Sequence, residues 1–140
     1  ILRDEYDIQI EFGDIGNILA YISIGDRIQD IERLVGALED IGRSYEKDSS
    51  TLYCGDFIQP EVVCTPQEAF YADKRQIPIR ETAGAICAEL VMCYPPGIPI
   101  LTPGERITGE IIEYILYAKE KGCSLQGTQD PSVQLLNVIV

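Results

Sequence analysis

The segment Tyr94–Glu105 contains four prolines within nine residues, and this density limits its backbone more than any other feature limits the rest of the chain. Proline fixes φ and lacks the N–H that a helix interior or a central strand requires. The segment is therefore predicted to be a stiff extended loop or a strand at the edge of a sheet. Glu105 ends it, so the direction of this carboxylate is expected to be fixed.

Near the start of the chain, the hydrophobic pattern predicts two strands followed by a long helix. Residues 8–12 alternate apolar and polar side chains, as in a half-buried strand, and residues 17–23 are almost continuously apolar, as in a more deeply buried strand. A turn joins the two. Asp26 is expected to cap the helix, with Gln29 three residues later. The apolar face of this helix is predicted to be Ile28, Ile31, Leu34, Val35, Leu38, Ile41 and Tyr45.

The periodic pattern stops after this helix and resumes with a second one. Residues 46–60 contain a charged and serine-rich stretch followed by glycine and proline, so a subdomain boundary is expected there. Thr65, Pro66 and Glu68 then supply an N-cap, a first-turn proline and a capping glutamate. They predict a short helix that ends near Asp73.

Three further elements are expected in the second half of the chain. A helical turn near Glu81 is predicted to lead into a strand by Leu90. Thr108 is expected to cap a helix that Gly122 closes, and residues 135–140 read as a last strand. The elements together predict an α+β fold, similar to an α/β sandwich. The expected domains are a strand–turn–strand–helix segment over 1–48, a linker over 49–60 and a C-terminal domain over 61–140.

Charge and missing residue types exclude several functions. The formal net charge of −12 argues against binding nucleic acid or an anionic membrane and favours cationic ligands. The chain has no histidine, which excludes a Ser-His or Cys-His triad and the common zinc sites within it, and no metal site is expected. No apolar run is long enough for a membrane helix. Five cysteines without a C-x-x-C pair suggest a reducing, cytoplasmic setting and mostly buried thiols.

The proline segment supplies the candidate site. A carboxylate held in place at Glu105 suits an amine or guanidinium ligand through a charge-assisted hydrogen bond. In the alternative interpretation, which the sequence supports equally, Glu105 has no ligand role and only precedes the helix capped by Thr108. Tyr94 is a candidate for stacking on a planar cation, or a tyrosine at the rim of the core. Cys93, beside the prolines, is held in reserve as a functional thiol.

Several motifs together resemble one enzyme family. Tyr94–Glu105, with the sequence YPPGIPILTPGE, and Glu81–Glu89, with ETAGAICAE, are similar to the C-terminal domain of bacterial ornithine/lysine/arginine decarboxylases. The first 45 residues look like the segment that enters that domain. Pro66–Tyr71 and Tyr114–Cys123 resemble the shorter Gram-positive branch, which places arginine ahead of lysine and ornithine as the substrate.

The resemblance implies a role within a larger enzyme. Such decarboxylases use pyridoxal phosphate on an aminotransferase-like fold, with the cofactor lysine in a Ser-x-His-Lys motif. Since this chain has no histidine and begins without Met, it is expected to be a fragment that binds no cofactor and is inactive alone. The implied partners are an upstream cofactor domain of the same chain, a second subunit, and cationic amino acids or amines. The implied role is to cover the active-site entrance.

The resemblance also suggests site residues and one departure. Tyr94, Gly97, Glu105 and Cys93 are the candidates at the substrate entrance, with no catalytic residue in this chain. Ala85 stands where the family pattern has a basic residue, so a pairing of that residue with Glu89 or Glu105 is expected to be lost here. The alternative hypothesis is a non-catalytic acidic module that binds polyamines or a protein partner through the Tyr94–Glu105 loop.

Overall fold

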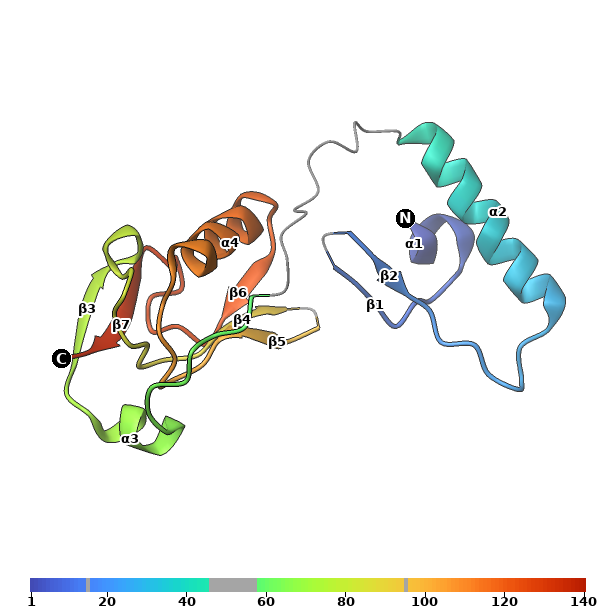
Figure 1. Cartoon of the computed structure of the whole chain (residues 1–140). Coiled ribbons are helices and arrows are strands. Elements are labelled where there is room, and N and C mark those ends of the chain that lie inside the picture. The colour runs from blue at the N-terminus through green and yellow to red at the C-terminus, as the bar shows by residue number, and fades with distance from the viewer. Residues whose placement is uncertain (15, 46–57, 95) are drawn as a thin grey trace. The chain divides into compact units, whose positions relative to one another are not determined.

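The computed structural model describes residues 1–14, 16–45, 58–94 and 96–140, and the chain divides into two compact units. We call Ile1–Tyr53 unit 1 and Cys54–Val140 unit 2. Both combine helices with small antiparallel sheets (Figure 1), so the predicted α+β class is confirmed. The linker expected over 49–60 lies mostly outside the described residues, and the domain boundaries remain a prediction.

Unit 1 consists of a short helix, a two-stranded hairpin and a long helix. The helices are α1 (Leu2–Tyr6) and α2 (Ile28–Ser44), and the strands are β1 (Phe12–Gly13) and β2 (Ile18–Leu19). The strands pair antiparallel, so the predicted strand–turn–strand unit is present. The helix α1 was not expected from the sequence.

Both strands of this hairpin are shorter than predicted. The expected strand over residues 8–12 is wrong except at Phe12. Leu19 is in register with Phe12, yet its carbonyl also accepts the amide of Glu11 at 2.9 Å, so the ladder is displaced by one residue and does not reach Ile8. Burial alternates here nonetheless, because Ile8 and Ile10 are half-buried while the polar residues Gln9 and Glu11 are exposed.

The deeper burial expected for residues 17–23 is also wrong. Ile18 is 45% exposed, Leu19 49%, and Ile22 58%. Among the described residues of unit 1, only Ala37 on α2 is buried. The reason is that one short hairpin and two helices provide no second layer over β2.

The start of α2 differs from the prediction by one residue. Arg27, and not Asp26, is the N-cap residue, and the carboxylate of Asp30 accepts its backbone N–H at 3.1 Å. Asp26 instead accepts the N–H of Ser23 and closes the preceding turn. An aspartate three residues after the cap therefore takes the part predicted for Gln29.

Unit 2 contains the remaining elements, and most were predicted. The helices are α3 (Pro66–Tyr71), the 3-10 turn η2 (Ile79–Glu81) and α4 (Gly109–Glu120). The strands are β3 (Lys74–Pro78), β4 (Val91–Tyr94), β5 (Ile98–Leu101), β6 (Ser124–Gln126) and β7 (Leu135–Ile139). The turn near Glu81, the strand after Leu90 and the last strand are confirmed, whereas β3 and β6 were missed.

Both predicted helix caps of unit 2 are present. The Thr65 hydroxyl accepts the N–H of Glu68 at 3.2 Å, and the Glu68 carboxylate accepts the N–H of Thr65 at 2.8 Å. Thr108 caps α4 by accepting the N–H of Ile111 at 3.2 Å. Gly122 follows α4 with a φ of +81°, the left-handed conformation that favours glycine at a helix end.

The strands of unit 2 form two sheets. One pairs β3 with β7, and the other has the order β5-β4-β6, all antiparallel (Figure 1). The proline segment thus contributes β5, an edge strand, which confirms the second form predicted for it. Pro99 lies in this strand opposite Met92, and an edge is where a strand tolerates a residue without an N–H.

A single core joins α4 to both sheets. Its members are buried aliphatic side chains and one thiol that pack together. They come from α4, from both sheets and from the segments that connect these elements. The core residues are Ile79, Cys87, Val91, Leu101, Ile107, Ile111, Ile112, Ile115, Val133, Leu136 and Val138.

Gly104 marks the closest backbone approach in unit 2. Its φ is +95°, and a Cβ placed there would lie 2.2 Å from the carbonyl oxygen of Cys64. The Gly104 carbonyl also accepts the amide of Val63 at 2.9 Å. Only glycine allows this contact, which fixes the end of the proline segment against the strand-like residues before α3.

Candidate functional site

The tip of the β4–β5 hairpin holds three of the four predicted site residues. Cys93 lies on β4, paired with Ile98 on β5 and Leu125 on β6, and is partly buried. Tyr94 is the last residue of β4, and Gly97 immediately precedes β5. The Gly97 amide donates to the Cys93 carbonyl at 2.9 Å, which closes the turn.

The tip presents an aromatic and an aliphatic side chain outward. Tyr94 is 52% exposed and Ile98 is 67% exposed. Gly97 has a φ of +96°, and a Cβ there would lie 3.4 Å from the Tyr94 ring, so a side chain at Gly97 would be strained and would press on the ring. Tyr94 therefore lies exposed beside Gly97.

Glu105 lies apart from the other three, beyond the opposite end of β5. It is only 9% exposed, and its carboxylate accepts the amide of Thr102 at 2.7 Å. Its backbone carbonyl accepts the amide of Cys87 at 2.8 Å. The side chain therefore closes the turn over residues 102–105 and is held as rigidly as the sequence suggested. A ligand role for this carboxylate stays a prediction.

Two acidic residues bond to the loop before β7: Glu89, which the sequence indicated only as a candidate partner of a basic residue, and Asp130, which it did not single out. The Glu89 carboxylate accepts three N–H groups at 2.9 Å, one from the Gln129 amide and two from the backbone and side chain of Asn137. The carboxylates of Glu89 and Glu105 therefore both accept hydrogen bonds from N–H groups, although Ala85 supplies no cation to pair with them. Ala85 itself packs against the core.

Asp130 is the second of these residues. Its carboxylate accepts the Ser132 hydroxyl at 2.7 Å and the amides of Ser132, Gln134 and Leu135. These bonds, led by the one from the Ser132 hydroxyl, hold the pKa of Asp130 well below its usual range. Buried Val133 has a left-handed φ of 48°, a strained conformation for a β-branched residue that the loop bonds and the core maintain.

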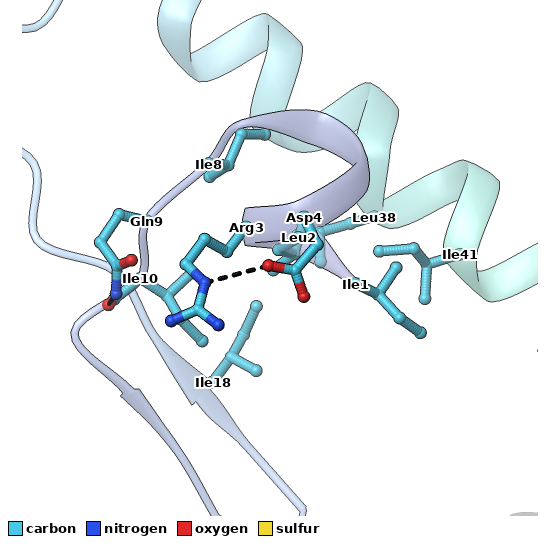
Figure 2. Close-up of a pocket in the computed structure, with 10 residues that line it drawn as sticks. All are labelled: Ile1, Leu2, Arg3, Asp4, Ile8, Gln9, Ile10, Ile18, Leu38 and Ile41. Carbon is cyan, nitrogen blue, oxygen red and sulfur yellow. Dashed lines mark hydrogen bonds and ion pairs between the residues drawn. The ribbon is translucent and has the colours of Figure 1, made fainter.

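Unit 1 contains a pocket of about 470 Å³ that no sequence pattern indicated. Figure 2 shows that its side chains come from α1, from the segment after it, from the hairpin and from α2. Most are apolar, and the Arg3–Asp4 ion pair at 3.1 Å supplies the charge. The lining residues are Ile1, Leu2, Arg3, Asp4, Ile8, Gln9, Ile10, Ile18, Leu38 and Ile41.

The described residues do not fit a pyridoxal phosphate site. That cofactor needs a lysine for its Schiff base, and no lysine lines the pocket. Lys74 and Lys121 are exposed, with their ammonium groups over the rings of Phe70 and Tyr117, and exposed Lys119 donates to the Ser132 carbonyl. Within the described ranges, no three His, Cys, Asp or Glu side chains gather as metal ligands. No helix in that part of the chain is long and apolar enough to cross a membrane.

Comparison with known proteins places the chain in a family. The family model described as "Orn/Lys/Arg decarboxylase, C-terminal domain" matches residues 49–130, more than half of the sequence. The chain belongs to this decarboxylase family. The match covers most of unit 2, including the β4–β5 hairpin and the turn closed by Glu105.

Two curated relatives extend the similarity over the whole chain. It is 40% identical to an arginine decarboxylase of Bacillus subtilis and 39% identical to one of Bacillus anthracis, each over 99% of this chain. These relatives confirm the resemblance to the short Gram-positive branch. The chain spans only 29% of the length of either relative.

A solved structure supports the fold of this decarboxylase domain. The lysine decarboxylase LdcF of Francisella novicida superposes with a TM-score of 0.72 and covers 99% of this chain, which matches 27% of that structure. At 22% identity, this likeness speaks for the fold alone.

Proposed function

We propose that the chain is the C-terminal part of a cytoplasmic, pyridoxal-phosphate-dependent decarboxylase that converts arginine to agmatine for polyamine synthesis. The observation that carries the proposal is the 40% identity to an arginine decarboxylase over 99% of the chain. Lysine and ornithine are the substrates to compare, because the matching family model names all three amino acids.

The cofactor chemistry belongs, in this proposal, to the rest of the polypeptide. The lysines of the described residues lie on the surface, and the chain has no histidine for a Ser-x-His-Lys motif. Residues 1–140 are therefore expected to be inactive alone. Their contribution is to bind the rest of the enzyme and to shape the approach of the substrate.

The proposed contribution of unit 2 is to cover the active-site entrance and support a dimer. The exposed Tyr94 and Ile98 near the hairpin tip are suited to contact a neighbouring domain or subunit. The acidic charge of −12 is expected to raise the local concentration of cationic amino acids, an effect that salt screens.

A decarboxylation assay tests the proposal. The longer polypeptide containing this chain should release carbon dioxide from arginine faster than from lysine or ornithine, while residues 1–140 with added pyridoxal phosphate should release none. Binding of agmatine or spermidine by the longer polypeptide with no decarboxylation of any of the three amino acids would instead support the non-catalytic acidic module.

Two variants of the longer polypeptide test the entrance residues. Tyr94→Ala should raise the KM for arginine, whereas Tyr71→Ala, which removes an exposed tyrosine from α3, should not. Glu105→Gln should raise the KM if the carboxylate faces the substrate. If Glu105→Gln lowers only the thermal stability, the bond to the Thr102 amide is its whole role.

A further inference from the structure

The segment from Ile18 to Ile24 has the sequence of a covered strand but is not covered. A nearly continuous apolar run is typical of a strand packed on both faces. In the structure the ladder holds only two residues, while Tyr21 is 82% exposed and Ile24 is fully exposed. The sequence therefore predicts more burial for this segment than the described residues provide.

One edge of this segment is open for pairing. The carbonyls of Asn17 and Leu19 accept the amides of Asp14 and Glu11, both at 2.9 Å, so these residues face β1. Because successive residues of an extended chain direct their backbone groups to opposite edges, Ile18 and Ala20 face away from β1. No hydrogen bond to the Ala20 backbone is found within the described ranges.

The helix of unit 1 leaves a matching apolar surface. Its predicted inward face includes Ile28, which is 71% exposed, Val35 at 50% and Leu38 at 39%. Leu38 also lines the apolar pocket together with Ile18 of the hairpin (Figure 2). Exposed apolar area of this extent marks an interaction surface, and an open strand edge is a template for another strand.

We propose that unit 1 takes an additional strand along the free edge of β2, supplied by the part of the decarboxylase polypeptide outside residues 1–140. This inference rests on the proposed function. The matched curated relatives have more than two-thirds of their length outside the match, because the chain spans 29% of them. Ile1 lines the pocket, so any residue that precedes it starts at this surface.

Such a strand accounts for the open edge and for part of the exposed apolar area of unit 1. Its backbone pairs with the outward groups of Ile18 and Ala20. Its apolar side chains lie beside those of β2, and a side chain next to Ile18 reaches the pocket of about 470 Å³.

Hydrogen exchange of the amides in residues 18–24 tests the proposal. In the longer polypeptide the amides of Ile18, Ala20 and Ile22, which face the free edge, should exchange at least about tenfold more slowly than in residues 1–140 alone. Equal exchange in both overturns it. Protection already present in the monomeric 140-residue chain, or gained there at high concentration with a doubled mass, also overturns it, because the occupant is then this chain or a second copy.

A proline substitution separates backbone pairing from side-chain contact. Ala20→Pro in the longer polypeptide removes an outward N–H and should abolish the slow exchange of Ile18 and Ile22. Ala20→Ser keeps the N–H and is the matched control, which should retain it. If Ala20→Pro leaves the protection unchanged, no strand pairs at this edge.

The outcome is independent of the enzymatic proposal. A longer polypeptide that decarboxylates arginine but exchanges freely at residues 18–24 refutes the strand and leaves the function. Slow exchange at residues 18–24 without decarboxylation of any basic amino acid refutes the function and leaves the strand.

Discussion

Unit 1 and unit 2 have similar hydrophobic patterning but differ in what that patterning buries. Unit 2 packs α4 against two sheets around a core that includes Ile107, Ile115 and Leu136, each fully buried. In unit 1, Ala37 is the only buried residue of the described ones. An amphipathic helix and an apolar strand thus do not make a core by themselves, because each needs a second layer to cover it.

The largest expected difference is in independent folding. As separate polypeptides, residues 54–140 should unfold cooperatively within about 4 °C of the 140-residue chain, and residues 1–53 should show no cooperative transition. The reason is that conformational entropy exceeds the little apolar burial within unit 1. Circular dichroism during heating measures both, and a cooperative transition in residues 1–53 would remove the contrast between the units.

Truncation of one isoleucine in each unit gives the next largest effect. Ile115→Ala should lower the free energy of unfolding by about 2–5 kcal/mol, because it leaves a cavity in the core. Ile28→Ala, at a position 71% exposed, should change it by less than about 0.5 kcal/mol. Urea unfolding of the 140-residue chain measures both values. Comparable losses would mean that α2 is covered in solution.

Backbone strain within unit 2 gives a smaller loss. Gly104→Ala should cost about 1–3 kcal/mol for the left-handed conformation, with the contact to the Cys64 carbonyl adding to it. Gly109→Ala is the control at the start of α4, where a Cβ meets nothing within 4 Å, and should be neutral or slightly stabilising. Urea unfolding decides, and equal values for the two variants would show that the turn at Gly104 rearranges readily.

The free energy of unfolding of unit 2 should depend on pH because its core contains a buried thiol. Burial raises the pKa of the Cys87 thiol from 9.0 to about 11. The neutral thiol is favoured in the folded state, so this contribution is complete below about pH 9 and is lost as the pH rises toward 11. The total is about 2–3 kcal/mol. Urea unfolding from pH 8 to 11 should show the slope, and Cys87→Ala should reduce it.

The smallest effect compares two turn aspartates. Hydrogen bonds lower the pKa of Asp130 in unit 2, chiefly from the Ser132 hydroxyl, and of Asp14 in unit 1, chiefly from the Gly16 amide. Each lowered pKa contributes stability that is present above the pKa of the unfolded chain and is lost as the pH falls through that of the folded chain.

Asp130→Asn should therefore lower the melting temperature of unit 2 at pH 7, and the difference from the unaltered chain should shrink below about pH 4. Asp14→Asn should leave the main transition unchanged, because the hairpin of unit 1 is not part of the unit 2 core. A shift with Asp14→Asn as large as with Asp130→Asn would show that the units unfold together.

The helix caps of unit 2 were predicted correctly, whereas the cap of α2 was misplaced by one residue and non-local strand pairing was not predicted. Thr65 and Thr108 were identified as caps because each bonds within one turn of its own helix. The strand β3 was missed because its polar residues show no alternation and its partner β7 lies near the other end of unit 2. The exposure of β2 escaped prediction since periodicity reports which face is apolar and not whether anything covers it.

The candidate site was predicted to a similar extent. Cys93, Tyr94 and Gly97 meet at one hairpin tip because they are neighbours in sequence. Glu105 was expected to lie with them, but it follows β5 at the end of that strand opposite to the hairpin tip. The three bonds to Glu89 join residues about forty to fifty positions apart, so no local pattern reveals them.

Pro99 has a consequence for how the molecule behaves in concentrated solution. It lies on β5, the outer strand of its sheet, where a proline leaves a break in the row of donors along the exposed edge. Pairing between copies of unit 2 along this edge of the sheet is therefore disfavoured.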